Sequence, residues 1–383
     1  MKSFATSHPQ HQKGILLIVV LLIVALVSVL ATETFSRITM DQRRSANIQQ
    51  SSQAYYFALG AEELAMQILQ RTFDGKDVLP GSANQGEGTN AGGKGGANGN
   101  GKDKSKTINL SQPWAQKGMV FPIEGGQLAG SIEDMSACFN INALIDQPIN
   151  QGATLSLGSD PNKPLILQSM LERLFKDILQ DSDQTTSPEA LVAALRDWLD
   201  TDQEPYGSYG AEDSVYQSKS PSYLTGNTLI GSVEELRTIE GFTPEIVERL
   251  SPYLCALPDT QMKSLNVNTI TKEHAALVAM LFEPKDWDKS KDLVNNRPPD
   301  GYGEEDLADA MKDLKFDKNA QGMLLVTSDR FLISAEAIVG RGHARLKSLV
   351  KKGKDDKIEV VSRRFASDYD NNQSNQNKSD TKK

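Results

Sequence analysis

The chain begins with a hydrophobic run that continues into a helical pattern. Residues 15–31 carry no charge and a single hydroxyl group, that of Ser28. At a rise of about 1.5 Å per residue, a helix of this length nearly matches a hydrocarbon core of about 30 Å. From Thr32 to Arg71 there is no proline, and apolar residues recur at helical spacing. The pattern predicts a transmembrane helix that continues as one long amphipathic helix.

Two distant blocks of the chain alternate apolar and polar residues, which is typical of strands. The first block, residues 114–144, contains a Gly-Gly pair at 125–126 that indicates a hairpin. In the second block, residues 323–365, Phe331, Ile333 and Ala335 alternate with other positions. We expect the two blocks to pair in one small antiparallel sheet packed on the N-terminal helix.

Between those blocks, residues 146–320 predict helices. Residues 165–181 are amphipathic, and a Ser-Pro-Glu capping signal at 187–189 opens another helix. Asn268 and Thr269 are cap candidates for a later helix. The predicted fold class is therefore α+β, a long helix on a small antiparallel sheet with a large all-α insertion.

Two segments are too polar to pack. Residues 81–106 are rich in Gly, Asn and Lys, and residues 366–383 are similarly polar, so they predict a flexible loop and a disordered tail. The chain then divides into a leader (1–14), a transmembrane helix (15–31), the first part of the sheet domain (32–145), the helical insertion (146–320), the second part of the sheet domain (321–365) and the tail (366–383).

The distribution of charge sets the topology and excludes one class of partner. Lys2 and Lys13 precede the apolar run and Glu33 is the first acid after it, which leaves the leader in the cytoplasm and the bulk of the chain outside. A cleavable signal peptide is the alternative, but the run exceeds the usual apolar region of about 7–15 residues and lacks a clean cleavage site. The net charge of −9 disfavours binding to nucleic acid.

At this point a family resemblance becomes specific. The segments QKGILLIVVLLIVALVSVLA, ACFNINAL, LRDWLDTDQEP, GAEDSVY and LNVNT resemble the K-type minor pseudopilins of the bacterial type II secretion system, and the likeness covers essentially the whole layout. It implies a pilin-like, non-enzymatic subunit of the inner membrane whose bulk lies in the periplasm and which caps the tip of the pseudopilus. It also implies the minor pseudopilins I and J as partners, with H beneath them, during export of folded proteins across the outer membrane.

The fifth residue after the leader supports that resemblance. Most pilins carry glutamate at this position, whereas Val19 occupies it here. A carboxylate inside packed apolar helices is costly unless a neighbouring terminal amine pairs with it. A subunit with no neighbour beyond it meets no such amine, so Val19 suits the end of a filament. The alternative is that Val19 is an ordinary lipid-facing residue.

An acidic loop is the richest candidate site. Asp200, Asp202, Glu204, Glu212 and Asp213 would repel one another if they came together, and Ca²⁺ accepts such oxygen ligands. The loop is not an EF-hand, because Pro205 stands where the sharp-turn glycine belongs. A solvated acidic loop is the alternative, but the family resemblance implies structural calcium in this stretch. Asp197 is a weaker ligand candidate that could instead lie on a helix surface.

The remaining chemistry-bearing residues do not form a catalytic set. The four histidines have no Cys or carboxylate partner at a motif spacing, so no enzyme activity is expected. Cys138 and Cys255 are expected to form a disulfide in an oxidising compartment, with two buried thiols as the alternative. Residues 233–254 resemble a helix-hairpin-helix, which leaves a membrane-anchored DNA-uptake protein as the rival function. The acids of that segment, and Thr243 in place of its second glycine, favour packing over DNA binding.

The leader generates a direct prediction. The resemblance implies that a prepilin peptidase cuts after Gly14 and methylates the new amino terminus at Ile15. Mass spectrometry of the membrane form should find a chain that starts at methylated Ile15. An intact Met1, or cleavage near Ala31, would contradict both the topology and the family resemblance.

Overall fold

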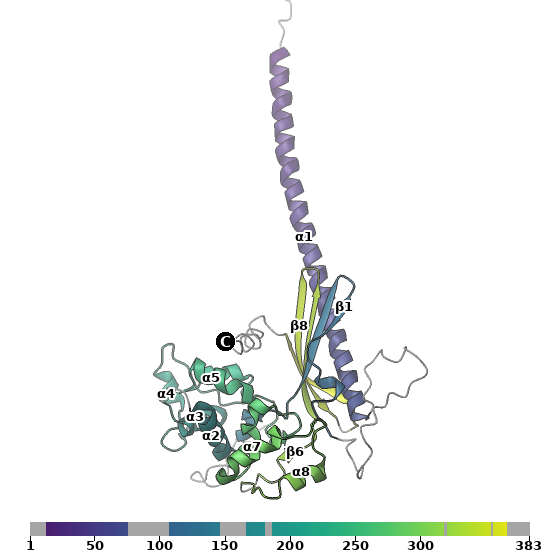
Figure 1. Cartoon of the computed structure of the whole chain (residues 1–383). Helices are drawn as coiled ribbons and strands as arrows, with labels where there is room; N and C mark the ends of the chain where they lie inside the picture. Colours follow the sequence, from purple (N-terminus) through teal and green to yellow (C-terminus); the bar gives the residue numbers. More distant parts are fainter. Residues whose placement is uncertain are drawn as a thin grey trace, which may run out of the picture.

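The computed structural model describes residues 13–75, 107–145, 166–180, 186–317, 320–353 and 355–365. The predictions for the leader before residue 13, the loop 81–106 and the tail 366–383 fall outside these ranges. Figure 1 shows a long helix, a sheet that packs on one half of it, and a helical lobe on the other side of the sheet. The fold class predicted from the sequence is confirmed.

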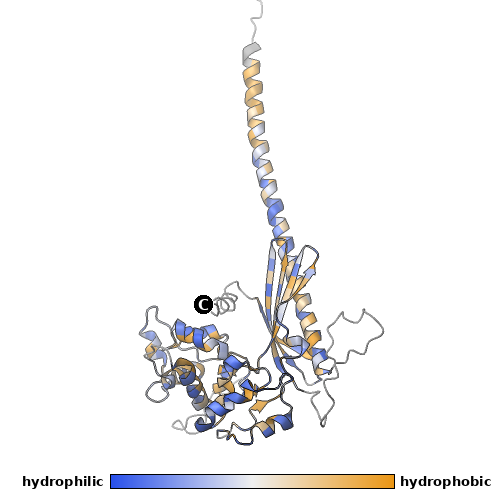
Figure 2. Ribbon diagram, viewed as in Figure 1, coloured by the Kyte–Doolittle hydropathy of each residue, from blue (hydrophilic) through white to orange (hydrophobic). Residues whose placement is uncertain are grey.

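The long helix is α1, Lys13–Phe73. Among the described residues it is the one helix long and apolar enough to cross a membrane. Its first half projects away from the body, and its apolar side chains from Leu16 to Leu30 are exposed (Figures 1 and 2). Its second half packs on the sheet. This division matches the predicted change from an apolar helix to an amphipathic one.

A five-stranded antiparallel sheet has the order β1-β2-β7-β8-β9. Its strands are β1 (Met119–Ile123), β2 (Gly126–Asp134), β7 (Arg330–Val339), β8 (Gly342–Lys352) and β9 (Ile358–Phe365). The β1–β2 hairpin turns at Gly125, whose φ of +74° suits glycine. The β2–β7 pair joins Asp134 to Phe331, so the two blocks of alternating residues meet in one sheet as predicted.

Two apolar clusters hold α1 on the sheet. At the end of the helix farthest from the apolar run, Leu69 packs with Trp114, Phe331 and Val350. Nearer the apolar run the cluster consists mainly of small side chains, including those of Ala54, Ala58, Ala335, Ala337 and Ala344. Small residues let the backbones approach closely. At Gly342 a Cβ atom would lie 2.3 Å from the Gln50 backbone, so this position requires glycine.

The helical lobe lies between β2 and β7 and has its own core, which includes Phe175, Leu195 and Phe282. Its α-helices are α2 (Ile166–Leu179), α3 (Pro188–Leu199), α4 (Asp213–Gln217), α5 (Pro244–Leu250), α6 (Ala276–Ala279), α7 (Trp287–Asn295) and α8 (Glu304–Ala310). Its short 3₁₀ helices are η4 (Ile141–Leu144), η5 (Val233–Thr238), η6 (Ser251–Tyr253), η7 (Lys272–His274) and η8 (Pro284–Asp286), whereas η3 (Pro113–Ala115) precedes β1 and packs in the sheet domain. The predicted cap of α3 is present, because the Ser187 hydroxyl accepts from the Ala190 N–H.

Asn268 and Thr269 do not cap a helix, and the prediction that they do is wrong. The next helical turn, η7, begins only at Lys272. Asn268 is fully buried and instead donates to the Tyr302 carbonyl and accepts from the Tyr302 N–H, while Thr269 donates to Asp134. Both side chains therefore join segments that are distant in the sequence.

Two short parallel strand pairs connect distant segments of the lobe close to the sheet. The strand β3 (Phe139–Asn140) pairs with β4 (Leu254–Cys255), and β5 (Leu265–Asn266) pairs with β6 (Leu324–Leu325). Beside the first pair lies a disulfide between Cys138 and Cys255, whose Cα atoms are 5.8 Å apart. The disulfide links the chain just after β2 to the end of the η5–α5–η6 segment.

A buried carboxylate organises the junction between sheet and lobe. Asp134, at the end of β2, accepts hydrogen bonds from the Ser136 N–H at 2.8 Å, the Thr269 hydroxyl at 2.6 Å and the Ser328 hydroxyl at 2.5 Å. The Asn266 amide donates to Ser328 and to the Ile108 carbonyl. Burial raises the pKa of Asp134, while these hydrogen bonds oppose that rise. One side chain thus connects the points where the chain leaves and re-enters the sheet.

A second buried acid fixes β9 to α1. Glu62 is 1 % exposed and receives a bidentate contact from Arg363, with N–O distances of 2.9–3.1 Å. The Arg363 side chain is itself partly exposed, so solvent screens part of the attraction. Removal of the arginine would nevertheless leave a buried carboxylate without its main partner.

We predict that Arg363→Ala lowers the free energy of unfolding by about 1–3 kcal/mol, the cost of an unsatisfied buried group. Urea unfolding of the detergent-solubilised chain, followed by tryptophan fluorescence, measures the effect because Trp114 lies in the same sheet core. Arg364→Ala is the matched control, since this exposed neighbour makes no such contact with Glu62. Equal stability of the two variants would show that the Glu62 contact contributes nothing.

Candidate metal centre

The acidic loop starts at the end of α3, and its first residues remain attached to that helix. The Asp200 N–H donates to the Arg196 carbonyl as the helix ends. Three residues earlier, Asp197 is fully buried, so the expectation that it could lie on the helix surface is wrong. Its carboxylate accepts from the backbone N–H groups of Tyr206, at 3.1 Å, and Ala211, at 2.8 Å. Asp197 therefore folds residues 201–211 back toward α3.

The loop closes tightly because of one glycine. At Gly210 a Cβ atom would lie 2.3 Å from the Tyr206 nitrogen and 2.4 Å from the Asp197 carboxylate. The Arg196 guanidinium stacks over the Tyr206 ring at 3.8 Å and covers the same turn. Only glycine lets the backbone at position 210 pass this close to Tyr206 and Asp197. Gly210 is therefore a residue of the sequence that indicates the closed loop, although its role is evident only from the structure.

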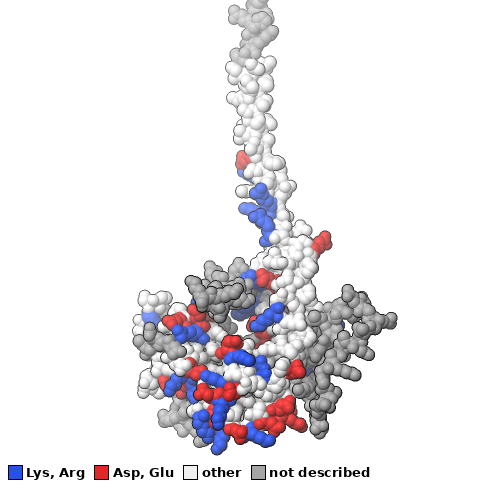
Figure 3. Space-filling model, viewed as in Figure 1, with Lys and Arg blue, Asp and Glu red and all other residues white. Residues whose placement is uncertain are grey.

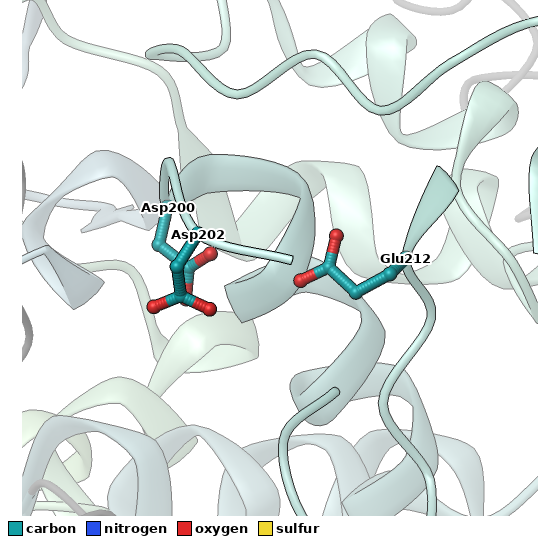
Figure 4. Close-up of side chains that lie close together, drawn as sticks. All are labelled: Asp200, Asp202 and Glu212. Carbon is teal, nitrogen blue, oxygen red and sulfur yellow. The ribbon is translucent and has the colours of Figure 1, made fainter. Parts of the chain in front are cut away.

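Three of the five predicted ligands come together. Asp200, Asp202 and Glu212 each present a carboxylate oxygen, and these oxygens lie within 4.8 Å of one another. Figure 4 shows Asp200 and Asp202 side by side with Glu212 pointing toward them from across the loop. Asp200 and Glu212 are each only 3 % exposed, whereas Asp202 faces solvent. The group therefore forms a partly enclosed cage of acidic oxygens.

The buried members of this group lack hydrogen-bond partners. Neither carboxylate oxygen of Glu212, nor Oδ1 of Asp200, has a partner among the described residues. Burial, followed by the neighbouring acids, raises the pKa of Asp200 to about 7 and that of Glu212 to about 8. Burial also raises the pKa of Asp197 to about 6, against the two backbone hydrogen bonds that it accepts. These carboxyl groups therefore bind a proton more readily than usual, and a bound cation would relieve the repulsion between them.

The other two predicted ligands occupy different environments. Asp213 accepts hydrogen bonds through Oδ1 from the Thr225 N–H at 2.9 Å and the Thr225 hydroxyl at 2.6 Å, and these bonds lower its pKa. Glu204 is exposed, and its backbone N–H donates to Asp202. Neither belongs to the group formed by Asp200, Asp202 and Glu212.

The donor chemistry defines what this cage can hold. Every side-chain ligand is a carboxylate oxygen, which favours a hard cation over the softer metals that prefer imidazole or thiolate. The carboxyl end of α3 adds the partial negative charge of its terminal carbonyl groups. Three buried, unpartnered oxygens therefore suit a divalent cation, and the residues present fit calcium.

The segment that resembles a helix-hairpin-helix forms η5 and α5. Thr243, which replaces the second glycine, caps α5 by accepting from the Ile246 N–H. The segment packs into the core of the lobe through Leu236, Ile246 and Leu250. Figure 3 shows acidic and basic side chains interspersed over the visible face of the lobe, without a continuous basic surface on that face.

The fold and site together define the class of protein. An apolar helix suited to a single membrane crossing continues onto an antiparallel sheet, and a helical lobe with an acidic cage interrupts that sheet. This is a pilin-like α+β protein. Residues 137–259 match the family model of the type II secretion system (T2SS), protein K.

Similar proteins extend this match over nearly the whole chain. The type II secretion system protein K of Aeromonas hydrophila is 32 % identical over 357 residues, which cover 92 % of this chain and 97 % of that protein. The protein K of Klebsiella pneumoniae is 33 % identical over 360 residues, with 93 % and 97 % covered. The chain belongs to the type II secretion system protein K family. These relatives are named as parts of a secretion system, which fits the expected non-enzymatic role.

A solved structure has the same fold. A chain in the crystal structure of the GspK-GspI-GspJ complex from the enterotoxigenic Escherichia coli type 2 secretion system superposes with a TM-score of 0.63 at 23 % identity. The similarity covers 85 % of this chain and 99 % of that chain.

Proposed function

We propose that this chain is a minor pseudopilin that caps the tip of the type II secretion pseudopilus and nucleates its assembly for protein export across the outer membrane. The observation that carries this function is the exposed apolar half of α1, which projects from the body on the side away from the lobe. Apolar side chains exposed over this length need lipid or the helices of other subunits. The helix thus supplies both a membrane anchor and an assembly surface.

The lobe supports the capping role through its position and size. It occupies the sequence between β2 and β7 and lies beside the end of the body opposite the free end of α1 (Figure 1). A further subunit added at that end of the body would have to displace the lobe. Val19, which is partly exposed on the apolar half of α1, offers no carboxylate to pair with the amino terminus of such a subunit. Both features favour addition of subunits on one side only.

We further propose that the partners are the type II secretion proteins I and J, with H below them. The solved complex with the same fold contains GspI and GspJ, and it motivates this choice. Processing by a prepilin peptidase would release the mature α1 from its leader. A location of the body in the periplasm agrees with the Cys138–Cys255 disulfide, because such bonds persist in oxidising compartments.

Calcium is proposed as the structural ion of the acidic cage. Asp200, Asp202 and Glu212 would hold it, with Asp197 keeping the loop closed around them. When bound, the ion neutralises the repulsion between the acids and ties the end of α3 to the start of α4. Its role would be to stabilise the lobe.

Calcium should raise the melting temperature of the full-length protein in detergent, whereas chelator should lower it. Binding to the folded form alone contributes about 2.7 kcal/mol at a hundredfold excess over the dissociation constant. Glu212→Gln should remove the calcium response and leave the chelated protein at least as stable as the wild type, because one unpartnered buried charge is gone. Magnesium, which requires a tighter octahedral shell, should stabilise less.

Glu204→Gln provides the control for this measurement. Glu204 belongs to the same loop but lies outside the group of three carboxylates, so its variant should keep the full calcium response. A wild-type melting temperature that is equal in calcium and in chelator would sink the calcium proposal.

The assembly role predicts a stable complex. The full-length chain, co-expressed with the proteins I and J of the same secretion system, should co-elute with both from a sizing column in detergent. A cell that lacks the chain should lose secretion, and the wild-type gene should restore it. Elution of the chain alone in the presence of both partners would contradict the proposed assembly.

A further inference from the structure

The two edges of the sheet differ in how they are protected. The edge strand β1 is five residues long and carries Pro122 as its fourth residue, which removes a backbone donor. The opposite edge strand, β9, is eight residues long and contains neither proline nor glycine. Proteins usually protect edge strands, because unpaired backbone groups pair readily with another chain. The edge at β9 has no proline, and it carries instead the charged residues Glu359, Arg363 and Arg364 and a register shift against β8.

The open edge has its backbone groups available. Within the part of the chain that the structure describes, the backbone groups of residues 359–365 bond only to β8. The strand is exposed along most of its length, including Val360, Val361 and Phe365, the last of which is 71 % exposed. The pairing of β9 with β8 skips Val361, so the outward N–H and C=O groups of β9 form two short runs on either side of that residue. These groups can accept one additional strand.

The side that faces α1 has a hollow next to the end of this edge. The hollow, of about 620 Å³, is lined by aromatic and aliphatic side chains, including those of Tyr55, Tyr56 and Phe365, and by the polar or basic side chains of Asn47, Ser51, Ser52, His343 and Arg345. The rings of Tyr55 and Phe365 lie 5.6 Å apart, and Tyr56 is 70 % exposed. A strand added to β9 would direct every second side chain to the face of the sheet that carries α1, and the side chain opposite Phe365 would lie next to this hollow.

The opposite side of the same edge is basic. Arg364 is paired with Lys347 of β8 in the register of the sheet, so the two side chains share the face away from α1. These two positive charges also act on Glu234 of the lobe. Burial tends to raise the pKa of Glu234, but the Ser232 hydroxyl and the charges of Arg364 and Lys347 lower it overall. This local positive charge stands out on a chain whose net charge is −9.

We propose that β9 is a docking edge that accepts an extended segment of a partner polypeptide whose apolar residues alternate with acidic ones. The backbone of the segment pairs with β9, its apolar side chains enter the hollow beside Phe365, and its acidic side chains face Arg364. Pairing through the backbone supplies the affinity, and the alternation supplies the specificity. This inference is independent of the proposed place at the pseudopilus tip.

A second copy of this chain is the competing occupant, since two β9 strands paired antiparallel about Val361 and Ser362 would place Glu359 opposite Arg364. The oligomeric state of the chain in solution therefore distinguishes a second copy from a different polypeptide.

The test uses the full-length chain in detergent micelles and a labelled eight-residue peptide that alternates glutamate with valine or phenylalanine. Fluorescence anisotropy should show binding at least tenfold tighter than for the matched peptide with lysine in place of glutamate. Hydrogen exchange of residues 359–365 should slow at least tenfold when the acidic peptide binds. Arg364→Glu should reverse the preference between the two peptides. Lys312→Glu, the same charge change at the end of α8, should leave it unaltered.

Two further controls separate backbone pairing from simple charge attraction. Acidic peptides that are N-methylated at alternate residues lose the donors on one edge, so methylation in one of the two frames should abolish binding and methylation in the other should not. Equal binding by both methylated peptides, or protection outside residues 359–365, would overturn the proposal. Sedimentation that shows a dimer of the chain, abolished by Val361→Pro, would assign the edge to a second copy and also overturn it.

Discussion

The structure depends on the pairing of β2 with β7, two strands separated by the whole helical lobe. The chain leaves the sheet at Asp134 and returns at Arg330, so closure of this long loop carries a large entropic cost. The hydrogen bonds of Asp134 help to offset that cost at the junction, because its carboxylate binds both the outgoing segment at Ser136 and the returning segment at Ser328. These bonds fix the adjacent ends of β2 and β7, the pair that joins the two parts of the sheet.

The same junction determines how the lobe sits on the body. The Cys138–Cys255 disulfide lies beside β3 and β4, and the β5–β6 pair lies at the same junction, where the Asn266 N–H donates to the Ser136 carbonyl. The acidic cage lies farther out, where α3 ends and α4 begins. The junction therefore holds the lobe on the sheet, whereas the proposed ion would hold the outer helices of the lobe together. These are separate tasks carried out by different chemistry.

Much of this architecture could be predicted from the sequence, because the signals were periodic. Alternation predicted the strands around Phe331 and Ile333, and the apolar run predicted α1. The failures involve polar residues whose partners are distant in sequence. Asn268 resembles a helix cap locally, but its partner is Tyr302, and the burial of Asp197 depends on a loop that returns to it. Likewise, the separation of Asp213 from the carboxylate group follows from Thr225, which no local pattern identifies.

Three sets of buried acids show why the cage calls for a cation. Asp134 is satisfied by hydroxyl, amide and backbone donors, and Glu62 is satisfied by the guanidinium of Arg363. Glu212 is as deeply buried as these two, yet both of its oxygens lack a partner within the described chain, and its neighbours Asp200 and Asp202 are acids as well. Hydrogen-bond donors and a guanidinium satisfy the buried acids elsewhere in the same molecule, whereas the cage has neither among the described residues. Its acids can be neutralised by protons, which their raised pKa values favour, or by a bound cation. The proposed divalent cation would do so for all three carboxylates at once and would remove the repulsion between them.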